Sequence, residues 1–409
     1  IINLTRFLKL ISKEIISEAK IYTAYVNQNT KWNFINLKLS NGIEGWGEAT
    51  LNKSEKIIVK LANNKFRLLI GMSLNQLINE FDHIFSLNDT PNAVLTSAVN
   101  AALIDLIAQN KNISVANELG GVINDEVEVY ANFNRRTIDR SPDGMKKSAK
   151  FVKNHGFNSF KIAPFDEVFP SQSKLDFHKS ISKGLERIDA IRDILGNNPK
   201  LMIDCHWRFK SEFIDVLIDE ILPFNIYWVE CPISENLEFT YEIKSIRNKL
   251  NDKGIKLAGL ETCITKDHFK PFLDIGCYDV MMPDVKYVGG PLKMMELANL
   301  IQSFKVEFSP HNPSGPICHA HSLQVCGAVK SSKILEHQFD ESPLFNELVN
   351  NQLPEIRNGK IKLSNSSGIG VKINKSLEFC FINKKLNLDT NRNNVFDNIV
   401  DLSKPDSKL

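Results

Sequence analysis

Two short apolar runs that each end in a carboxylate lie in the middle of the chain, Leu201-Met202-Ile203-Asp204 and Tyr227-Trp228-Val229-Glu230. Between them, Glu212–Leu222 has the spacing of an amphipathic helix. An apolar run, a helix and a second apolar run are typical of one strand–helix–strand unit in a parallel sheet. The rest of the central region repeats this unit.

The alternation of apolar runs and helical stretches extends on both sides of this unit, and eight runs can be counted. They are Val127–Tyr130, Ser159–Ile162, Leu201–Ile203, Tyr227–Val229, Lys256–Gly259, Val280–Met282, Val306–Phe308 and Ile334–Leu335. Helical stretches between them include Met145–Asn154, Leu185–Leu195, Glu212–Leu222, Leu237–Leu250, Pro291–Ser303 and Ala320–Val329. Eight strands in this order predict an α/β fold with a TIM barrel, although the pattern alone also allows a doubly wound sheet.

The first quarter of the chain has a different, α+β pattern. Apolar and polar side chains alternate over residues 35–39, and Asn41-Gly42 after them is a typical hairpin turn. Helical spacing follows near residues 54–64 and from Thr96 to Asn110. We therefore expect a small α+β region before the barrel.

Strand signals return after residue 350, on both sides of a second dipeptide that is typical of a hairpin turn, Asn358-Gly359. The end of the chain from Asn383 is polar, and we expect it to be poorly ordered. We divide the chain into an N-terminal α+β region (1–125), a barrel (126–350) and a C-terminal segment with a polar tail (351–409).

The overall composition indicates which kinds of binding partner the protein is not expected to have. The chain has 409 residues, 43% of them hydrophobic, and its 50 basic and 48 acidic residues leave a net charge of +2. We expect no nucleic-acid and no membrane partner, because bulk charge is small and no apolar run reaches about 18 residues. The first residues lack the pattern of a signal peptide, and the seven cysteines form no CxxC pair. These features favour reduced thiols and a cytoplasmic location.

Residues capable of chemistry end most of the apolar runs. They are Asp204, Glu230, Glu261, Asp284, His311 and Glu336, and Lys161 lies within the second run. Any one of these residues, taken alone, could equally be a helix cap or an ordinary loop residue. Because the C-terminal ends of barrel strands open onto one rim, we expect the whole series to converge there.

Three of these carboxylates come from consecutive strands. Asp204 and Glu230 are 26 residues apart, and Glu261 follows after 31 more, about one strand–helix unit each. Carboxylates that meet in one place repel each other and take up protons unless a cation neutralises them. The sequence therefore predicts a hard divalent cation with oxygen ligands, Mg²⁺ first.

Two histidines are placed for proton transfer. His311 follows Asp284 by one strand–helix unit, so Asp284 could fix the tautomer of His311 and raise its basicity. His206 lies two residues beyond Asp204, and both side chains can point into the barrel mouth. A packed or solvent-facing loop histidine remains the alternative for His206.

Several motifs together resemble the enolase superfamily, in particular its mandelate racemase branch and the acid-sugar dehydratases of the galactonate type. The resemblance runs from about Phe34 to Val371. The motifs are Glu44-Gly45-Trp46-Gly47-Glu48, Phe157-Asn158-Ser159-Phe160-Lys161, Asp204-Cys205-His206-Trp207-Arg208, Trp228-Val229-Glu230-Cys231-Pro232, Pro283-Asp284 with Gly289-Gly290, and Ser309-Pro310-His311-Asn312-Pro313-Ser314-Gly315-Pro316.

The resemblance implies a modified TIM barrel closed by a capping domain, which is formed by the N-terminal region and the C-terminal segment. It implies Mg²⁺ on the three carboxylates, a small-molecule acid sugar as substrate and a homo-oligomer. His311 with Asp284 would be the general base, and His206 the general acid. Glu336, protonated through a raised pKa, would donate a hydrogen bond to a substrate oxygen, and Lys161 would lie near the substrate carboxylate.

One departure from the family bears on the reaction. Relatives with a Lys-x-Lys motif carry a second basic lysine where this chain has Ala163. The missing base and the presence of His206 favour dehydration to a 2-keto-3-deoxy sugar acid. A racemase or epimerase using the two histidines is the alternative, and a non-catalytic acid-binding barrel is a second one.

Specificity is expected to come from loops around the barrel mouth. The resemblance points to Asn27–Trp32 and to the segment just after Glu48. Candidates for contacts with substrate hydroxyls follow the first barrel strand: Asn132, Asn134, Arg135 and Arg136. Lys286, just beyond Asp284, has no assigned role in this interpretation, and its side chain could either face solvent or meet a distal substrate group.

Overall fold

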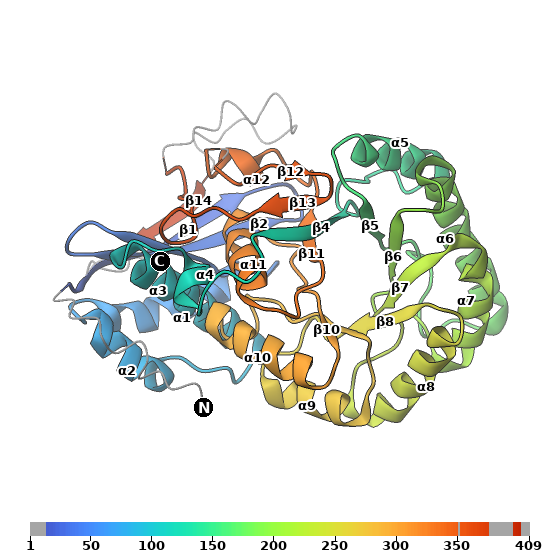
Figure 1. The fold of residues 1–409 in the computed structure, drawn as a ribbon, viewed down its shortest axis with the longest axis horizontal. Coiled ribbons are helices and arrows are strands. Elements are labelled where there is room, and N and C mark those ends of the chain that lie inside the picture. Colours follow the sequence, from blue (N-terminus) through green and yellow to red (C-terminus); the bar gives the residue numbers. More distant parts are fainter. Residues whose placement is uncertain (1–13, 351, 376–395, 402–409) are drawn as a thin grey trace.

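The computed structural model describes residues 14–350, 352–375 and 396–401, the last of these as backbone only. Its larger part is a barrel of parallel strands surrounded by helices (Figure 1). Each strand overlaps one of the eight apolar runs, so the predicted barrel class is confirmed. The strands are β4 (Glu126–Asn132), β5 (Ser159–Ile162), β6 (Lys200–Asp204), β7 (Ile226–Glu230), β8 (Lys256–Gly259), β9 (Val280–Met281), β10 (Glu307–Phe308) and β11 (Leu335–Gln338).

Neighbouring strands pair in parallel from β4 to β10, and β11 pairs in parallel with β4. Strands β10 and β11 are joined by fewer backbone contacts than the other neighbouring strands. Their connection consists of an isolated bridge between Phe308 and Ser332, reinforced by the Lys333 N–H, which donates to the Phe308 carbonyl at 3.1 Å. All the strands therefore point their C-terminal ends toward the same rim.

Helices cover the outside of the barrel (Figure 1). They are α5 (Pro142–Lys153), α6 (Lys174–Leu195), α7 (Ile214–Ile221), α8 (Thr240–Asn251), α9 (Lys266–Ile275), α10 (Pro291–Ser303) and α11 (Pro316–Ala328). Local sequence fixes several ends: the hydroxyl of Ser141 caps α5, that of Ser173 caps α6, and Gly196 ends α6 with a positive φ of 74°. Sequence alone does not indicate α9, since Pro271 interrupts its interior.

The barrel interior below the rim is filled by large side chains. Tyr130, Met202 and Trp228 are buried there, and the Tyr130 and Trp228 rings pack edge to face with centroids 5.6 Å apart. Side chains alternate along a strand, so Met202 and Asp204 lie on the same inward side of β6. The packed floor thus supports the carboxylates above it.

The capping domain begins with an antiparallel sheet in the order β14-β1-β2-β3, in which the edge strand β14 (Phe396–Asp401) comes from the C-terminal segment. The strands are β1 (Ile16–Tyr25), β2 (Lys31–Leu39) and β3 (Glu44–Glu48), and the helices are α1 (Glu55–Leu69), α2 (Leu74–Ile84), α3 (Thr90–Asn110) and the short α4 (Val115–Glu118). The predicted turn at Asn41-Gly42 joins β2 to β3, with Gly42 at φ 90°.

Helix α3 is the core helix of this domain. A Cβ added to Gly47 of β3 would lie 1.8 Å from the Ala98 carbonyl oxygen of α3, so glycine permits the close approach. Of the helices that the structure describes, only α3 has the length and apolar content of a membrane span, and 83% of its most apolar stretch is buried inside the protein. Such burial is typical of a core helix.

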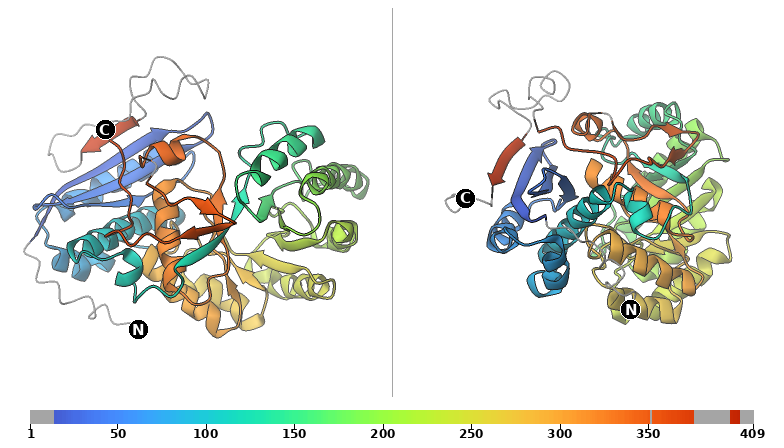
Figure 2. Two further views of the ribbon diagram at one scale, coloured as in Figure 1. Left: turned by 45° about the horizontal axis from the view of Figure 1, so that its top comes forward. Right: turned by 60° about the vertical axis from the view of Figure 1, so that its left-hand side comes forward.

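The C-terminal segment pairs with strands of both the barrel and the capping domain. After α12 (Leu344–Glu347), β12 (Ile356–Arg357) and β13 (Lys360–Lys362) form a hairpin, and β13 pairs antiparallel with barrel strand β4. The predicted turn Asn358-Gly359 connects them. Further on, β14 (Phe396–Asp401) pairs with β1 of the capping sheet (Figure 2).

The polar tail is only partly covered by the structure. Strand β14 lies within it and pairs with β1. The remainder, 383–395 and 402–409, lies outside the described residues.

Candidate active site

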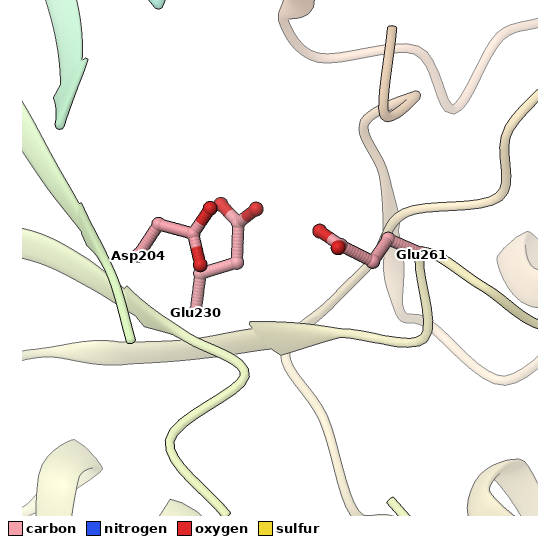
Figure 3. Close-up of side chains that lie close together, drawn as sticks. All are labelled: Asp204, Glu230 and Glu261. Atoms are coloured by element: carbon pink, nitrogen blue, oxygen red, sulfur yellow. The ribbon is translucent and has the colours of Figure 1, made fainter. Parts of the chain in front are cut away.

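Three acidic side chains meet at the barrel rim. Asp204 ends β6, Glu230 ends β7, and Glu261 stands two residues beyond β8. All three are buried, with at most 5% of each residue exposed. Each offers a carboxylate oxygen within 4.8 Å of the others. Figure 3 shows Asp204 and Glu230 side by side, with Glu261 facing them.

The charge of the surrounding pocket fits a divalent cation. Five buried carboxylates (Asp204, Glu230, Glu261, Asp284 and Glu336) lie around two buried ammonium groups (Lys161 and Lys286), so acidic groups outnumber basic ones. A hard cation with oxygen ligands relieves such an excess, whereas protonation is the alternative for a cluster without one.

The carboxylate of Glu261 is the member of the cluster with the fewest compensating contacts. Its Oε2 accepts no hydrogen bond from the described residues, and His311 Nε2 lies 3.5 Å away. Burial, then repulsion from Asp204 and Glu230, raises the pKa of Glu261 well above its usual value. Burial likewise raises the pKa of Glu230 to about 7. The set Asp204, Glu230 and Glu261 could therefore hold a metal ion.

His311 and Asp284 form a hydrogen-bonded pair. The ring Nδ1 of His311 lies 2.8 Å from Asp284 Oδ2, so the ring turns its Nε2 toward the carboxylate cluster. Burial lowers the pKa of His311, because it outweighs the opposing effect of Asp284. A neutral imidazole with Nδ1–H donated to Asp284 leaves Nε2 able to accept a proton.

Lys286, which the sequence left without a role, belongs to this pair. Its Nζ lies 3.0 Å from Asp284 Oδ2, the oxygen that His311 also contacts, and donates to Ser314 Oγ at 2.8 Å. Its backbone N–H donates to Asp284 Oδ1 at 2.9 Å. Lys286 therefore helps to fix Asp284 while its side chain lines the cavity.

His206 contacts a different carboxylate of the cluster from the one nearest His311. Its Nε2 lies 2.9 Å from Asp204 Oδ2, and 38% of its side chain is exposed. Burial opposes a positive charge on the ring, but Asp204 outweighs burial and raises the pKa of His206. The two histidines thus have pKa values shifted in opposite directions.

Glu336 and Lys161 differ in part from the sequence-based expectation. Lys161 Nζ lies 2.6 Å from Glu230 Oε1 and 2.9 Å from Glu336 Oε1, and the Asn312 N–H donates to Glu336 Oε2 at 2.7 Å. Burial would raise the pKa of Glu336, but Lys161 and then His311 outweigh it, and the pKa is lowered. This direction differs from the raised pKa expected of a hydrogen-bond donor: here Glu336 accepts hydrogen bonds from Lys161 and from the Asn312 N–H. Asn132 Nδ2 also donates to it, at 2.7 Å.

A cavity of about 360 Å³ opens above these groups, between the barrel and the capping domain. The capping domain contributes Thr50, Leu51 and Asn52, from the predicted segment just after Glu48. Glu48 itself accepts hydrogen bonds from the N–H groups of Gly315 and Cys318 at the start of α11, which ties the capping domain to the loop that carries His311.

The other loop residues named from the sequence divide into two groups. Asn132, Asn134 and Arg135 line the cavity, whereas Arg136 pairs with Asp340 and stacks on Phe151 outside it. The loop Asn27–Trp32 contributes no lining residue among those described. It meets the barrel instead through Thr30, whose hydroxyl donates to Glu341 at 2.6 Å.

The sequence matches two families of known proteins. Residues 18–120 match the family described as mandelate racemase / muconate lactonizing enzyme, N-terminal domain, and residues 144–377 match enolase C-terminal domain-like. The second match alone spans more than half of the chain. The protein belongs to the enolase superfamily.

Individual relatives agree with this assignment. The chain is 25% identical over 341 residues to a D-gluconate dehydratase from Thermoproteus tenax (82% of this chain, 67% of that protein) and 27% identical over 351 residues to a D-gluconate/D-galactonate dehydratase from Picrophilus torridus (84% and 86%). A mandelate racemase/muconate lactonizing enzyme-like protein from Roseovarius sp. TM1035 has the same fold, with a TM-score of 0.78, 19% identity and coverage of 88% and 94%. This superfamily member is an enzyme, and its curated relatives place it among the hydro-lyases.

Sequence reasoning missed two groups of the site. Glu235 contacts the loops that carry the metal-ligand candidates, but an acidic residue in a loop carries no signal of its own. The role of Asn312 beside His311 was also missed. Its side chain donates to the backbone carbonyl of Glu336 at 3.1 Å, a contact that only the folded barrel creates.

Proposed function

We propose that the protein is a Mg²⁺-dependent acid-sugar dehydratase. It removes the proton next to the substrate carboxylate and expels the β-hydroxyl as water, giving a 2-keto-3-deoxy sugar acid. The observation that carries the proposal is the placement of His311 and His206 around one cluster of three buried carboxylates, in a cavity large enough for a small polyol. The names of the matched relatives support the substrate class.

The proton transfer begins at His311. Its Nε2 accepts the proton from C2 of the substrate, while Asp284 stabilises the imidazolium that forms. Lys161 is placed to bind the substrate carboxylate, since its Nζ lies at the rim between Glu230 and Glu336. Held by Asp204, Glu230 and Glu261, Mg²⁺ would supply positive charge where negative charge develops on the carboxylate oxygens.

The elimination uses the second histidine. His206, protonated beside Asp204, donates its proton to the hydroxyl on C3, and the C3–O bond breaks to release water. The resulting enol takes up a proton at C3 and becomes the ketone, so the atoms balance as loss of one water. The Thr50–Asn52 segment lines the cavity on the side of the capping domain, where it would limit the entry of bulk water.

A screen of mono- and diacid sugars with Mg²⁺, read by the formation of 2-keto acid and by product mass, tests this function. We expect one or a few sugar acids to lose water. A product of unchanged mass with inverted C2 would instead support the racemase or epimerase, which the two-histidine arrangement also allows. No reaction with any acid sugar in the presence of Mg²⁺ would remove the proposal.

A further inference from the structure

The loop between β7 and α8 carries an acidic residue, Glu235, that is not part of the carboxylate cluster but accepts hydrogen bonds from three other segments of the barrel. Its Oε1 accepts from the Leu260 N–H at 2.7 Å and from the Tyr278 hydroxyl at 2.8 Å. Its Oε2 accepts from the Trp207 indole N–H at 3.0 Å. The Cys231 thiol is a fourth neighbour, with Sγ 3.7 Å from Oε1.

All of these donors except Tyr278 are direct chain neighbours of site residues. Trp207 follows His206, Cys231 follows Glu230, and Leu260 precedes Glu261. One carboxylate thus joins the three turns that present the general-acid candidate and two of the metal-ligand candidates.

The three turns also share an unfavourable backbone conformation. Trp207 has φ 56°, Cys231 φ 45° and Leu260 φ 69°, although none of them is glycine. The left-handed conformation is unfavourable for residues other than glycine, and it persists only where neighbouring contacts hold it. A common acceptor for the three residues provides such contacts.

The absence of a side chain at Gly259 leaves room for the Glu235 carboxylate. A Cβ added to Gly259, at the end of β8, would lie 2.3 Å from Glu235 Oε1 and 2.7 Å from the Tyr278 ring. Any larger residue at this position would displace the carboxylate from its donors.

We propose that Glu235 is a positioning residue for the metal site: it holds the turns that carry Glu230 and Glu261 and thereby sets the affinity for the divalent cation. The inference rests on the proposed metal site and adds a residue to it. Glu235 does not itself enter the cluster of three carboxylates. Partners that orient metal ligands typically change metal affinity by about 10- to 100-fold when they are replaced.

The variant Glu235→Gln keeps the shape of the side chain but can accept hydrogen bonds at one terminal atom only. Its amide nitrogen must face either the Trp207 N–H or the pair of donors at Leu260 and Tyr278. We expect the dissociation constant for Mn²⁺ or Mg²⁺ to rise at least about tenfold. Glu238→Gln is the matched control, because Glu238 is exposed three residues away and loses the same charge.

Metal binding is measured on protein stripped with EDTA, by the electron paramagnetic resonance signal of free Mn²⁺ and by calorimetric titration with Mg²⁺. Thermal unfolding of each metal-free variant shows that the protein measured is folded. If Glu235→Gln does not fold, Tyr278→Phe removes one donor and keeps the carboxylate, and we expect a smaller rise in the dissociation constant.

The outcomes separate the two proposals. Wild-type affinity in Glu235→Gln and Tyr278→Phe overturns the role of Glu235, and so does an equal loss in Glu238→Gln. A wild-type protein that binds neither ion overturns the proposed function itself, and the role of Glu235 with it.

Discussion

Replacing Lys161 by methionine tests whether the carboxylate cluster is held together by charge. Lys161 Nζ lies 2.6 Å from Glu230, 2.9 Å from Glu336 and 4.0 Å from Asp204, and its side chain is 1% exposed. At an effective dielectric constant of about 20, each of the two short pairs interacts by about 6 kcal/mol before the desolvation of the ions is counted. Removing one partner of a buried pair has a net cost of about 3–5 kcal/mol.

We therefore expect Lys161→Met to lose about 3–5 kcal/mol of unfolding free energy in EDTA, measured by urea denaturation at pH 8. Saturating Mg²⁺ should restore part of the loss, because the ion supplies the positive charge that the variant lacks. Lowering the pH toward 6 should also restore part of it, since Glu230, with a pKa of about 7 in the wild type, takes up a proton.

Lys200→Met is the control for this experiment. Lys200 pairs with Glu128 at 2.8 Å, but both side chains are 37% exposed, so the same substitution should change stability by less than about 1 kcal/mol. Equal stability of Lys161→Met and the wild type without metal, or no effect of Mg²⁺ on the variant, would refute the electrostatic reasoning.

Other predictions address the chemistry, the pH dependence and the capping domain. His311→Asn should lose C2 proton exchange in D₂O and dehydration, whereas His206→Asn should retain exchange and lose dehydration, each loss being about 10²- to 10⁴-fold; equal exchange in both variants would contradict the assigned roles. Burial lowers the pKa of His321 to about 4, so the unfolded chain binds this proton at a higher pH than the folded protein does. The free energy of unfolding should therefore fall as the pH drops from about 6.5 toward 4, and His321 should account for up to about 3 kcal/mol of the decrease. Urea denaturation at pH 7 and 5 should show a smaller decrease for His321→Gln, and an unchanged decrease would be inconsistent with a neutral buried ring. Gly47→Ala, whose methyl group would meet the Ala98 carbonyl at 1.8 Å, should lose about 3 kcal/mol or fail to fold, and wild-type stability would contradict the close packing.

The barrel and the positions of its rim residues follow from sequence because both depend on short-range patterns. An apolar run that ends in Asp204 or Glu230 gives the end of its strand directly, and parallel order brings all such ends to one rim. The helix α10 coincides with the expected Pro291–Ser303, since proline and amphipathic spacing define it. These features require no knowledge of contacts between distant segments.

Features that depend on long-range contacts could not be predicted in the same way. The pKa of Glu336 is lowered because Lys161 and the Asn312 N–H approach it from other segments, which residue type alone does not show. The hairpin around Asn358-Gly359 is visible in sequence, but its pairing with β4 is not, because the partner strand lies far away along the chain. Only the hydrogen bonds that Glu235 accepts in the folded protein show that it belongs to the site.

Anomalous diffraction from crystals grown with Mn²⁺ tests the central claim most directly. We predict one strong peak within coordination distance of Asp204, Glu230 and Glu261, which is lost in Glu261→Gln. A peak bound elsewhere, or no peak in wild-type crystals at saturating Mn²⁺, would contradict the account.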